Sequence, residues 1–232
     1  MDSIVHNCMT KAGRKVVVID NAIPTEIGND LYEYMQYFGR WNFNPDEEEE
    51  SDMVPFIHGF DNDLIHQSPL WDLLKKPLIQ HFGEGYVPYN CSVNHLRFGD
   101  NPIDHRDTHN PTKKDVTLLL YMNPSWNLNF AGETVYFDEQ GEIELAVLPK
   151  FRRLGMHEGY INHAARSPSR LFKGARYTLA IKATPDMAYL KTRTHEDVPE
   201  DKDMIDRRAV LAKNLFGDTQ EQTAVVSPRS YA

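Results

Sequence analysis

Residues 116–137 read VTLLLYMNPSWNLNFAGETVYF, and this stretch holds two short runs rich in leucine, β-branched and aromatic residues. The runs, at 116–122 and 133–137, favour extended strands, and the Asn123-Pro124-Ser125 step between them is typical of a turn. The same rhythm continues on both sides of this stretch. Further strands are expected at residues 89–98, 143–148, 158–163 and 175–182. Many short strands separated by turns predict a β-sandwich or barrel.

The sequence before residue 87 has a different pattern. Residues 15–20, KVVVID, predict one strand. A helix is expected over about residues 25–38, with Thr25 as its N-cap. A second helix is expected over 69–83, where leucines recur at helical spacing and Pro77 would kink or split it. Helices therefore precede a β-rich core.

Polar segments complete the chain. The acidic run DEEEES at 46–51 predicts a solvated loop, because like charges repel and stay hydrated. After Pro185 the composition turns polar, with one helix expected at 203–216 and a tail beyond it. We therefore predict one domain at 1–184, whose β-core spans about 87–184. Residues 185–232 form a C-terminal extension that is partly helical or a tail.

Composition and charge narrow the function classes. The 232 residues include 25 basic and 34 acidic side chains, a formal net charge of −9, which disfavours a nucleic-acid partner. Two cysteines, Cys8 and Cys91, do not make a disulfide framework, so a reducing, cytoplasmic setting is expected. The first ten residues lack an apolar segment typical of a secretory signal, and no apolar run is long enough to cross a membrane.

Three residues suggest a metal site. His105 and Asp107 project to the same side if their stretch is extended, and His163 follows 58 residues later. Two histidines and one carboxylate on one face form the facial triad of non-haem Fe(II) oxygenases. These three donors hold the metal from one side, which leaves adjacent positions open for a co-substrate and oxygen.

The expected final strand carries a candidate anion-binding residue. Alternation in ARYTLAIK, residues 175–182, puts Arg176, Thr178 and Ala180 on one face, which is polar and small. Bulky apolar side chains occupy the other face, which is suited to packing. The planar guanidinium of Arg176 can grip a carboxylate with two hydrogen bonds, and Thr178 can donate another.

The order of these motifs resembles a known family. HRD (105–107), TLLLYMNPSW (117–126), AGETVYF (131–137), VLPK (147–150), His163 and GARYT (174–178) follow one another as in the prolyl-4-hydroxylase-like branch of the 2-oxoglutarate/Fe(II) dioxygenases. The resemblance covers about residues 89–184. More weakly, VVVIDNAIP (16–24) is similar to the usual start of such domains.

The resemblance implies a fold, cofactors and residue roles. The fold would be a double-stranded β-helix, or jelly roll, with N-terminal bracing helices. The cofactors would be Fe(II), 2-oxoglutarate and O₂, with ascorbate as a possible reductant. The implied iron ligands are His105, Asp107 and His163. The implied partners of the distal 2-oxoglutarate carboxylate are Arg176, Thr178 and Tyr121.

Other residues remain as alternatives. The 13-residue spacing from His163 to Arg176 exceeds the common family spacing, so Arg170 competes for the carboxylate role. The AGET segment at 131–134 is interpreted as structural. His109 is not expected to bind iron, because a fourth protein ligand would close a position that substrate needs. No ligand role is predicted for the remaining histidines considered, His58, His66, His81 and His157, and Cys91 is expected in the core.

The substrate class stays open at this level. We expect a hydroxylase of a small amino-acid-like or natural-product molecule, with a peptidyl hydroxylase as the runner-up. A nucleic-acid demethylase is a third alternative, since NHLRFGDNPIDH (94–105) partly resembles that branch. A binding module without catalysis is the non-enzymatic alternative. The speculative substrate contacts are Arg97, His109 and Arg166, and parts of 41–60, 109–114 and 185–232 are expected to form a lid.

Overall fold

The computed structural model describes residues 3–43 and 56–188. The chain divides into two compact units, Met1–Asp186 and Met187–Ala232, and the description below concerns the first. The acidic run at 46–51, the helix expected at 203–216 and the tail all lie outside the described residues. Within the described residues, no helix combines the length and the apolar character that a membrane span requires.

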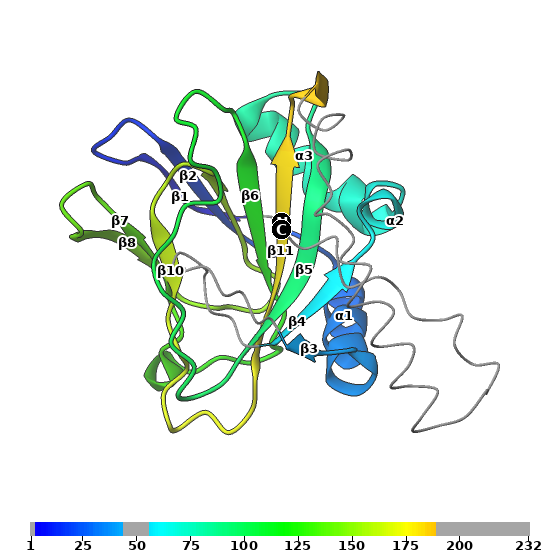
Figure 1. The fold of residues 1–232 in the computed structure, drawn as a ribbon. Helices are drawn as coiled ribbons and strands as arrows, with labels where there is room; N and C mark the ends of the chain where they lie inside the picture. The colour runs from blue at the N-terminus through cyan, green and yellow to red at the C-terminus, as the bar shows by residue number, and fades with distance from the viewer. Residues whose placement is uncertain (1–2, 44–55, 189–232) are drawn as a thin grey trace, which may run out of the picture. The chain divides into compact units, whose positions relative to one another are not determined.

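Two antiparallel β-sheets form the molecule (Figure 1). The larger sheet has eight strands in the order β1-β2-β9-β6-β11-β5-β4-β3, and the smaller has the order β10-β7-β8. The strands are β1 (Ser3–Met9), β2 (Lys15–Asp20), β3 (Asn42–Phe43), β4 (Phe56–Phe60), β5 (Val87–Leu96), β6 (Val116–Tyr121), β7 (Thr134–Phe137), β8 (Ile143–Val147), β9 (Leu154–Glu158), β10 (His163–Ala165) and β11 (Arg176–Thr184). This is the predicted jelly-roll class, which is therefore confirmed.

Most predicted strands agree with the structure, but one is wrong. The expected strand at 158–163 instead spans the end of β9, a turn at 159–162 and the first residue of β10. There the Gly159 N–H donates to the Asp115 carbonyl, and the Ile161 N–H donates to the Glu158 carbonyl. The chain must reverse here to pass from the larger sheet to the smaller one. The short or outer strands β1, β3 and β4 were not predicted from sequence.

Both expected helices are present, as α1 (Thr25–Phe38) and α3 (Pro69–Phe82). A short helix, α2 (Asn62–His66), was not predicted. The predicted N-cap of α1 is wrong. Pro24 occupies the cap position with φ −55° and ψ 151°, no side chain caps the helix, and Thr25 is its first helical residue. The ring of Pro24 already holds φ near the value that the helix entry needs. Pro77 lies inside α3 without ending it.

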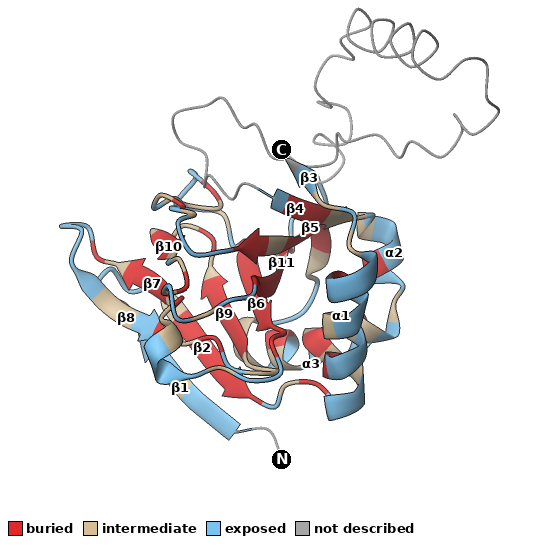
Figure 2. Ribbon diagram, turned by 90° about the horizontal axis from the view of Figure 1, so that it is seen from below, coloured by how far each residue is buried: buried red, intermediate tan, exposed pale blue. Residues whose placement is uncertain are grey.

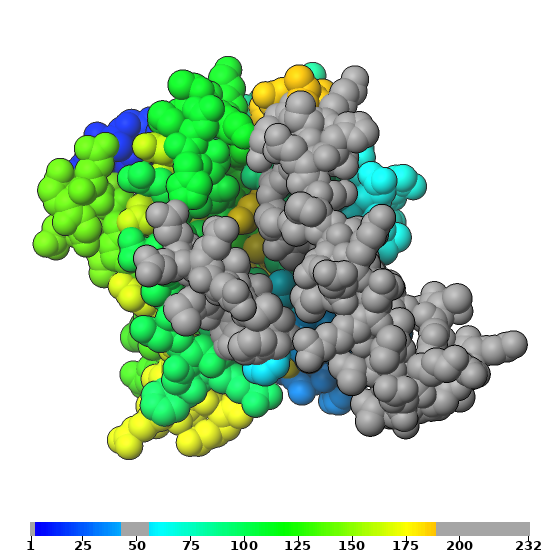
Figure 3. All heavy atoms as spheres, in the orientation of Figure 1, coloured from blue at the N-terminus to red at the C-terminus, as the bar shows by residue number. Residues whose placement is uncertain are grey.

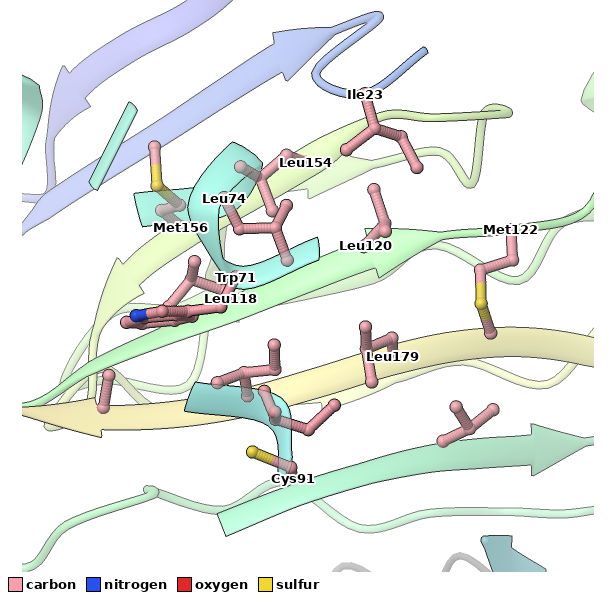
Figure 4. Close-up of a cluster of buried hydrophobic side chains, with 14 of the residues drawn as sticks. Ile23, Trp71, Leu74, Cys91, Leu118, Leu120, Met122, Leu154, Met156 and Leu179 are labelled. Carbon is pink, nitrogen blue, oxygen red and sulfur yellow. The ribbon is translucent and has the colours of Figure 1, made fainter. Parts of the chain in front are cut away.

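The helices cover one face of the larger sheet (Figure 2). Met35, Trp71, Leu74 and Leu78 from the helices share one buried cluster with strand residues such as Leu118. Figure 4 shows part of this cluster, where Trp71 and Leu74 lie among side chains of the sheet. Because fully burying a side chain of this size contributes about 1.5–3 kcal/mol, this cluster is a main source of stability.

The opposite face of the larger sheet looks into the roll. As alternation predicted, Tyr177, Leu179 and Ile181 enter the helix-covered core, whereas Arg176 and Thr178 lie on the other face. A second buried cluster fills the space between the sheets, and its members are Val16, Val18, Tyr121, Tyr136, Val147 and Ile161. The polar face of β11 therefore points to the interior of the roll.

The N-terminal hairpin is fastened to the smaller sheet. Lys11, in the turn between β1 and β2, donates its ammonium to Asp138 at 2.6 Å and its backbone N–H to Glu144 at 2.8 Å. Figure 3 shows the blue atoms of this hairpin beside the light green atoms of the β7–β8 region. These contacts help to hold the two sheets together at that edge.

Two histidines are buried on the helix side of the sheet. The ring of His95 lies 4.8 Å from that of Trp41 and 5.5 Å from that of Tyr177. His58 accepts a hydrogen bond from the Arg40 N–H at 2.9 Å and packs 4.8 Å from the ring of Phe60. Burial lowers the pKa of both imidazoles below the ordinary value.

This burial predicts a pH-dependent stability. Below about pH 6.5 the unfolded chain takes up protons that the buried rings resist, so the free energy of unfolding decreases as the pH falls. Replacing His95 with phenylalanine keeps a ring in the stack and removes one such group. Urea unfolding measured at about pH 7.5 and pH 5.5 gives the free energy of unfolding at each pH. Its decrease between the two should be smaller for His95→Phe than for the wild type. His66→Phe, at an exposed position, should show the same decrease in the free energy of unfolding as the wild type. An equal decrease in the wild type and both variants would contradict the prediction.

Candidate metal and carboxylate-binding site

A single bridge brings the two predicted histidine ligands together. The His105 N–H donates to the His163 carbonyl and the His163 N–H donates to the His105 carbonyl, both at 2.9 Å. Their rings lie 4.5 Å apart, although 58 residues separate them in sequence. The bridge thus joins the segment after β5 to the start of β10.

Asp107 completes the cluster. Its Oδ1 lies 3.7 Å from His105 Nε2, and its Oδ2 lies 3.6 Å from His163 Nε2. One ligand atom from each residue lies within 4.8 Å of the others, a spacing at which all three can contact one metal ion. The cluster is therefore a candidate site for a divalent transition metal.

Backbone carbonyls orient both imidazoles. His163 Nδ1 lies 3.0 Å from the Ile161 carbonyl, and His105 Nδ1 lies 3.4 Å from the Ile103 carbonyl. A hydrogen bond from Nδ1–H fixes the ring and leaves the Nε2 lone pair for a metal. Burial, aided by the nearby His157, holds the pKa of His163 well below its usual value. The ring is therefore neutral, as metal binding requires.

The Asp107 carboxylate is buried and surrounded by hydrogen-bond donors. Its side chain is 2% exposed, and Lys182 Nζ lies 2.9 Å from Oδ1. The Thr117 hydroxyl donates to Oδ2, and His157 Nε2 lies 3.4 Å from the same oxygen. Burial alone would raise the pKa of Asp107, but Lys182 and the three histidines hold it well below its ordinary value. The carboxylate is therefore an anion, available as a ligand.

His157, for which the sequence predicts no ligand role, lies beside the cluster of His105, Asp107 and His163 but is not a member of it. Its side chain is fully buried, its ring lies 4.3 Å from that of His163, and the Tyr136 hydroxyl lies 3.3 Å from its Nδ1. Placing a strand at 158–163 instead of 154–158 hid the alternation that turns His157 toward the interior. Lys182 was also missed, although it lies one step beyond Ala180 on the face that alternation had already identified.

A second group of polar side chains surrounds Arg176. Arg176 is 1% exposed, and its Nη2 donates to Thr134 Oγ1 at 3.0 Å. The Tyr121 hydroxyl donates to the same oxygen at 2.7 Å, and Thr178 lies directly opposite Tyr121 in the sheet. Thr134 belongs to the AGET segment, which the sequence predicts to be structural. No sequence signal marked its hydroxyl as part of the site.

This group has the features of an anion-binding pocket. Within the described part of the chain, no carboxylate lies at ion-pair distance from Arg176. Arg176 Nε and Thr178 Oγ1 are buried without a hydrogen-bond partner there. A buried cation with open donors beside it fits a carboxylate ligand, because such groups are otherwise costly to leave unpaired.

The other candidates lie at the surface. Arg170 is exposed in the segment between β10 and β11, in contrast to buried Arg176. Arg97 and His109 are exposed as well. Arg166 is exposed and places its guanidinium 5.5 Å from the centre of the Phe137 ring. The structure thus brings the triad together, whereas Arg97, His109, Arg166 and Arg170 are exposed at the surface. Cys91 is buried in the core as expected, and burial raises the pKa of its thiol to about 12.

Comparison with known proteins supports the fold. No family model matches the sequence, and no curated protein matches it. Among solved structures, a prolyl-4-hydroxylase from Pseudomonas putida aligns with a TM-score of 0.57 at 18% identity, covering 75% of this chain and 94% of that one. A Trichoplax adhaerens prolyl hydroxylase, solved with a peptide fragment of the hypoxia inducible factor oxygen degradation domain, gives 0.54 at 15%, covering 73% and 83%.

A third similar structure is an oxidoreductase of the 2OG-Fe(II) oxygenase family from Burkholderia pseudomallei. It aligns with a TM-score of 0.54 at 10% identity, covering 74% of this chain and 84% of that one. At these identities the likeness concerns the fold. The chain has the jelly-roll fold seen in prolyl-4-hydroxylases and other 2OG-Fe(II) oxygenases, in agreement with the resemblance read from the motifs.

The geometry predicts how metal binding responds to mutation. Asp107→Ala and His163→Ala should each weaken Mn(II) binding by about a hundredfold or more, because each removes a donor from a three-donor cluster. His109→Ala, at an exposed position, should bind Mn(II) as the wild type does. Calorimetric titration of the full-length proteins gives the affinities. Loss of metal in His109→Ala together with its retention in His163→Ala would overturn the ligand set.

Proposed function

We propose that the protein is an Fe(II)- and 2-oxoglutarate-dependent dioxygenase. It would hydroxylate an unactivated C–H bond of a small amino-acid-like or natural-product substrate and release succinate and CO₂. The observation that carries the proposal is the presence of two features within the same roll. These are the His105, Asp107 and His163 cluster and the buried Arg176 with open donors beside it.

Each residue has a defined task in this proposal. His105, Asp107 and His163 hold the metal from one side. Arg176 grips the distal carboxylate of 2-oxoglutarate with its planar fork, and Tyr121 and Thr178 lie beside it. When bound, iron and 2-oxoglutarate supply the oxidising power that places one oxygen atom of O₂ in the substrate. Ascorbate as a reductant belongs to the same proposal.

Burial around Arg176 serves this task. Tyr121 and Tyr136 are each at most 1% exposed and line the space between the sheets. Exclusion of water there strengthens the interaction between a guanidinium and a carboxylate. Gly132, at φ +81°, adds a steric constraint, because a Cβ at this position would lie 2.9 Å from the Trp126 ring and 3.4 Å from Arg176 Cδ. The glycine lets the β6–β7 connection pack closely against the arginine.

A small polar substrate is supported by the strand next to β11. Asn94 and Ser92 on β5 lie opposite Thr178 and Ala180 and therefore share the inner face with them. A protein substrate is the second candidate, because one similar structure is a prolyl hydroxylase solved with a peptide fragment. The net charge of −9 argues against a nucleic-acid substrate. Contacts by Arg97, His109 and Arg166, and a lid over the entrance, remain predictions.

The reaction can be tested by product formation. We expect the wild type to release succinate from 2-oxoglutarate in the presence of Fe(II) and O₂, with more release when a pool contains its substrate. A metabolite library and a peptide library, at equal concentrations, separate the two substrate classes. Asp107→Ala should release none above background. Peptide hydroxylation without turnover of any small molecule would favour the second candidate, and no succinate with either library would contradict the proposal.

The carboxylate clamp gives a separate prediction. Arg176→Ala should weaken 2-oxoglutarate binding by a hundredfold or more, since removing one partner of a buried charged pair costs about 3–5 kcal/mol. Arg176→Lys should recover part of this affinity as a point charge without the fork. The exposed Arg170→Ala is the matched control. Calorimetry with Mn(II) and without oxygen measures the affinities, and an equal or larger loss at position 170 would reverse the assignment.

A further inference from the structure

The ladder that pairs β6 with β11 ends before it reaches Arg176. Its last pair is Tyr121 with Thr178, and the same register would place Asn123 opposite Arg176. On its other edge, β11 stays paired with β5 as far as Arg176. The first residues of β11 are therefore held by a regular ladder on one edge only.

The side chain of Asn123 supplies the bonds that the backbone does not make. Continued in register, the ladder would need a bond from the N–H of residue 124 to the Ala175 carbonyl, but Pro124 has no N–H. Instead, Asn123 Nδ2 donates to the Ala175 carbonyl at 2.8 Å. The Tyr177 N–H donates to Asn123 Oδ1, also at 2.8 Å. One amide thus bonds the residues on both sides of Arg176.

The surroundings of Asn123 make these two bonds hard to exchange for water. Asn123 is 5% exposed, and its amide carries both an acceptor and donors, as a peptide group does. Breaking either bond would leave a buried backbone group without a partner, which is costly. Asn123 therefore fixes the point at which the Arg176 side chain leaves the sheet.

The side chain of Arg176 is confined along its length as well. A Cβ at Gly132 would lie 3.4 Å from Arg176 Cδ and 2.9 Å from the Trp126 ring, so the backbone passes closely between them. Trp126 Nε1 donates to the Ala131 carbonyl at 2.8 Å, which fixes the indole. At the far end, Arg176 Nη2 donates to Thr134 Oγ1 at 3.0 Å. The guanidinium thus has one defined location as long as the backbone beneath it is fixed.

A defined location for the guanidinium selects a length of ligand. In the proposed reaction, one end of the 2-oxo acid meets the metal held by the triad, and the distal carboxylate meets Arg176. With both ends fixed, a diacid with one more methylene must give up part of one contact. Selectivity is a difference between two affinities, so it decreases when one of the fixed ends becomes loose.

We propose that Asn123 is a positioning residue that makes the protein select the chain length of its 2-oxo acid co-substrate. It acts through Arg176, whose backbone it holds from both sides. The inference rests on the proposed dioxygenase function and adds to it the residue on which discrimination between homologous oxo acids depends.

The test compares 2-oxoglutarate with 2-oxoadipate, which is one methylene longer. The full-length wild type, Asn123→Ala, Asn123→Ser and Asn129→Ala are loaded with Mn(II) and titrated with each acid by calorimetry, without oxygen. Asn129 is exposed in the same β6–β7 connection and is the matched control. The measured quantity is the ratio of the two affinities within each protein. A general loss of folded protein affects both acids alike and leaves this ratio unchanged.

We expect the wild type and Asn129→Ala to favour 2-oxoglutarate. Asn123→Ala should lose about tenfold of that preference, the effect of removing two hydrogen bonds. Its affinity for Mn(II) should stay unchanged, because the metal ligands lie on other segments. Asn123→Ser keeps a hydroxyl that can restore one of the two bonds, so its loss should be smaller.

An unchanged ratio in both Asn123 variants would overturn the inference, even if both affinities fall. If Asn123→Ala does not fold and therefore binds no Mn(II), the ratio in Asn123→Ser decides. An equal change in Asn129→Ala would also contradict the inference. A wild type that binds 2-oxoglutarate without preferring it to 2-oxoadipate would overturn the inference and leave the dioxygenase proposal standing. Failure of the wild type to bind either acid and to make succinate would reject both.

Discussion

The reciprocal pair of backbone hydrogen bonds between His105 and His163 is the constraint on which the candidate site depends. These two bonds join the long segment after β5 to the first residue of β10. They set the separation of the two imidazoles without relying on either side chain. Asp107, two residues beyond His105, then turns back to the same point. The ligand positions therefore follow from backbone geometry, which is less sensitive to surface sequence than side-chain packing.

The inner face of the roll separates two kinds of buried charge. Near the triad, the Asp107 carboxylate contacts the Lys182 ammonium, accepts a hydrogen bond from Thr117 on β6 and lies 3.4 Å from His157 Nε2 on β9. Near the start of β11, the Arg176 guanidinium donates to Thr134 and lies near the Tyr121 ring, and among the described residues no carboxylate pairs with it. A buried charge with neutral partners alone is expensive to maintain. The contrast explains why an anionic ligand is assigned to the second location and a cationic one to the first.

Much of the fold was predictable because the strand propensity of the residues and the alternation of apolar and polar side chains agree in most strands. The rhythm of strands and turns predicted the jelly roll, and alternation along β11 correctly separated its core face from its polar face. The spacing of His105 and Asp107, the later His163 and the family resemblance together indicated the triad. The strands β1, β3 and β4 were missed because outer and very short strands depend on pairing with distant segments, which no local pattern reports.

The errors at the site have a related cause. The β9 sequence LGMHE lacks the β-branched residues that mark strands, so a strand was predicted at 158–163 and His157 fell outside it. Thr134 was overlooked because a threonine in a strand is ordinary, and only the fold shows that its hydroxyl meets Arg176. Lys182 required no new signal, only one further step along a face already identified.

The position of β11 in the larger sheet has a consequence for how the chain folds during synthesis. This strand is the last of the described strands in sequence, yet it lies between β6 and β5 and hydrogen-bonds to both. During synthesis, therefore, β5 and β6 leave the ribosome long before the strand that joins them. Their inner edges stay open until residue 184 is available, a situation that favours chaperone contact and slow closure. Because β11 also carries Arg176 and Lys182, the sheet and its chemistry are completed by the same late event.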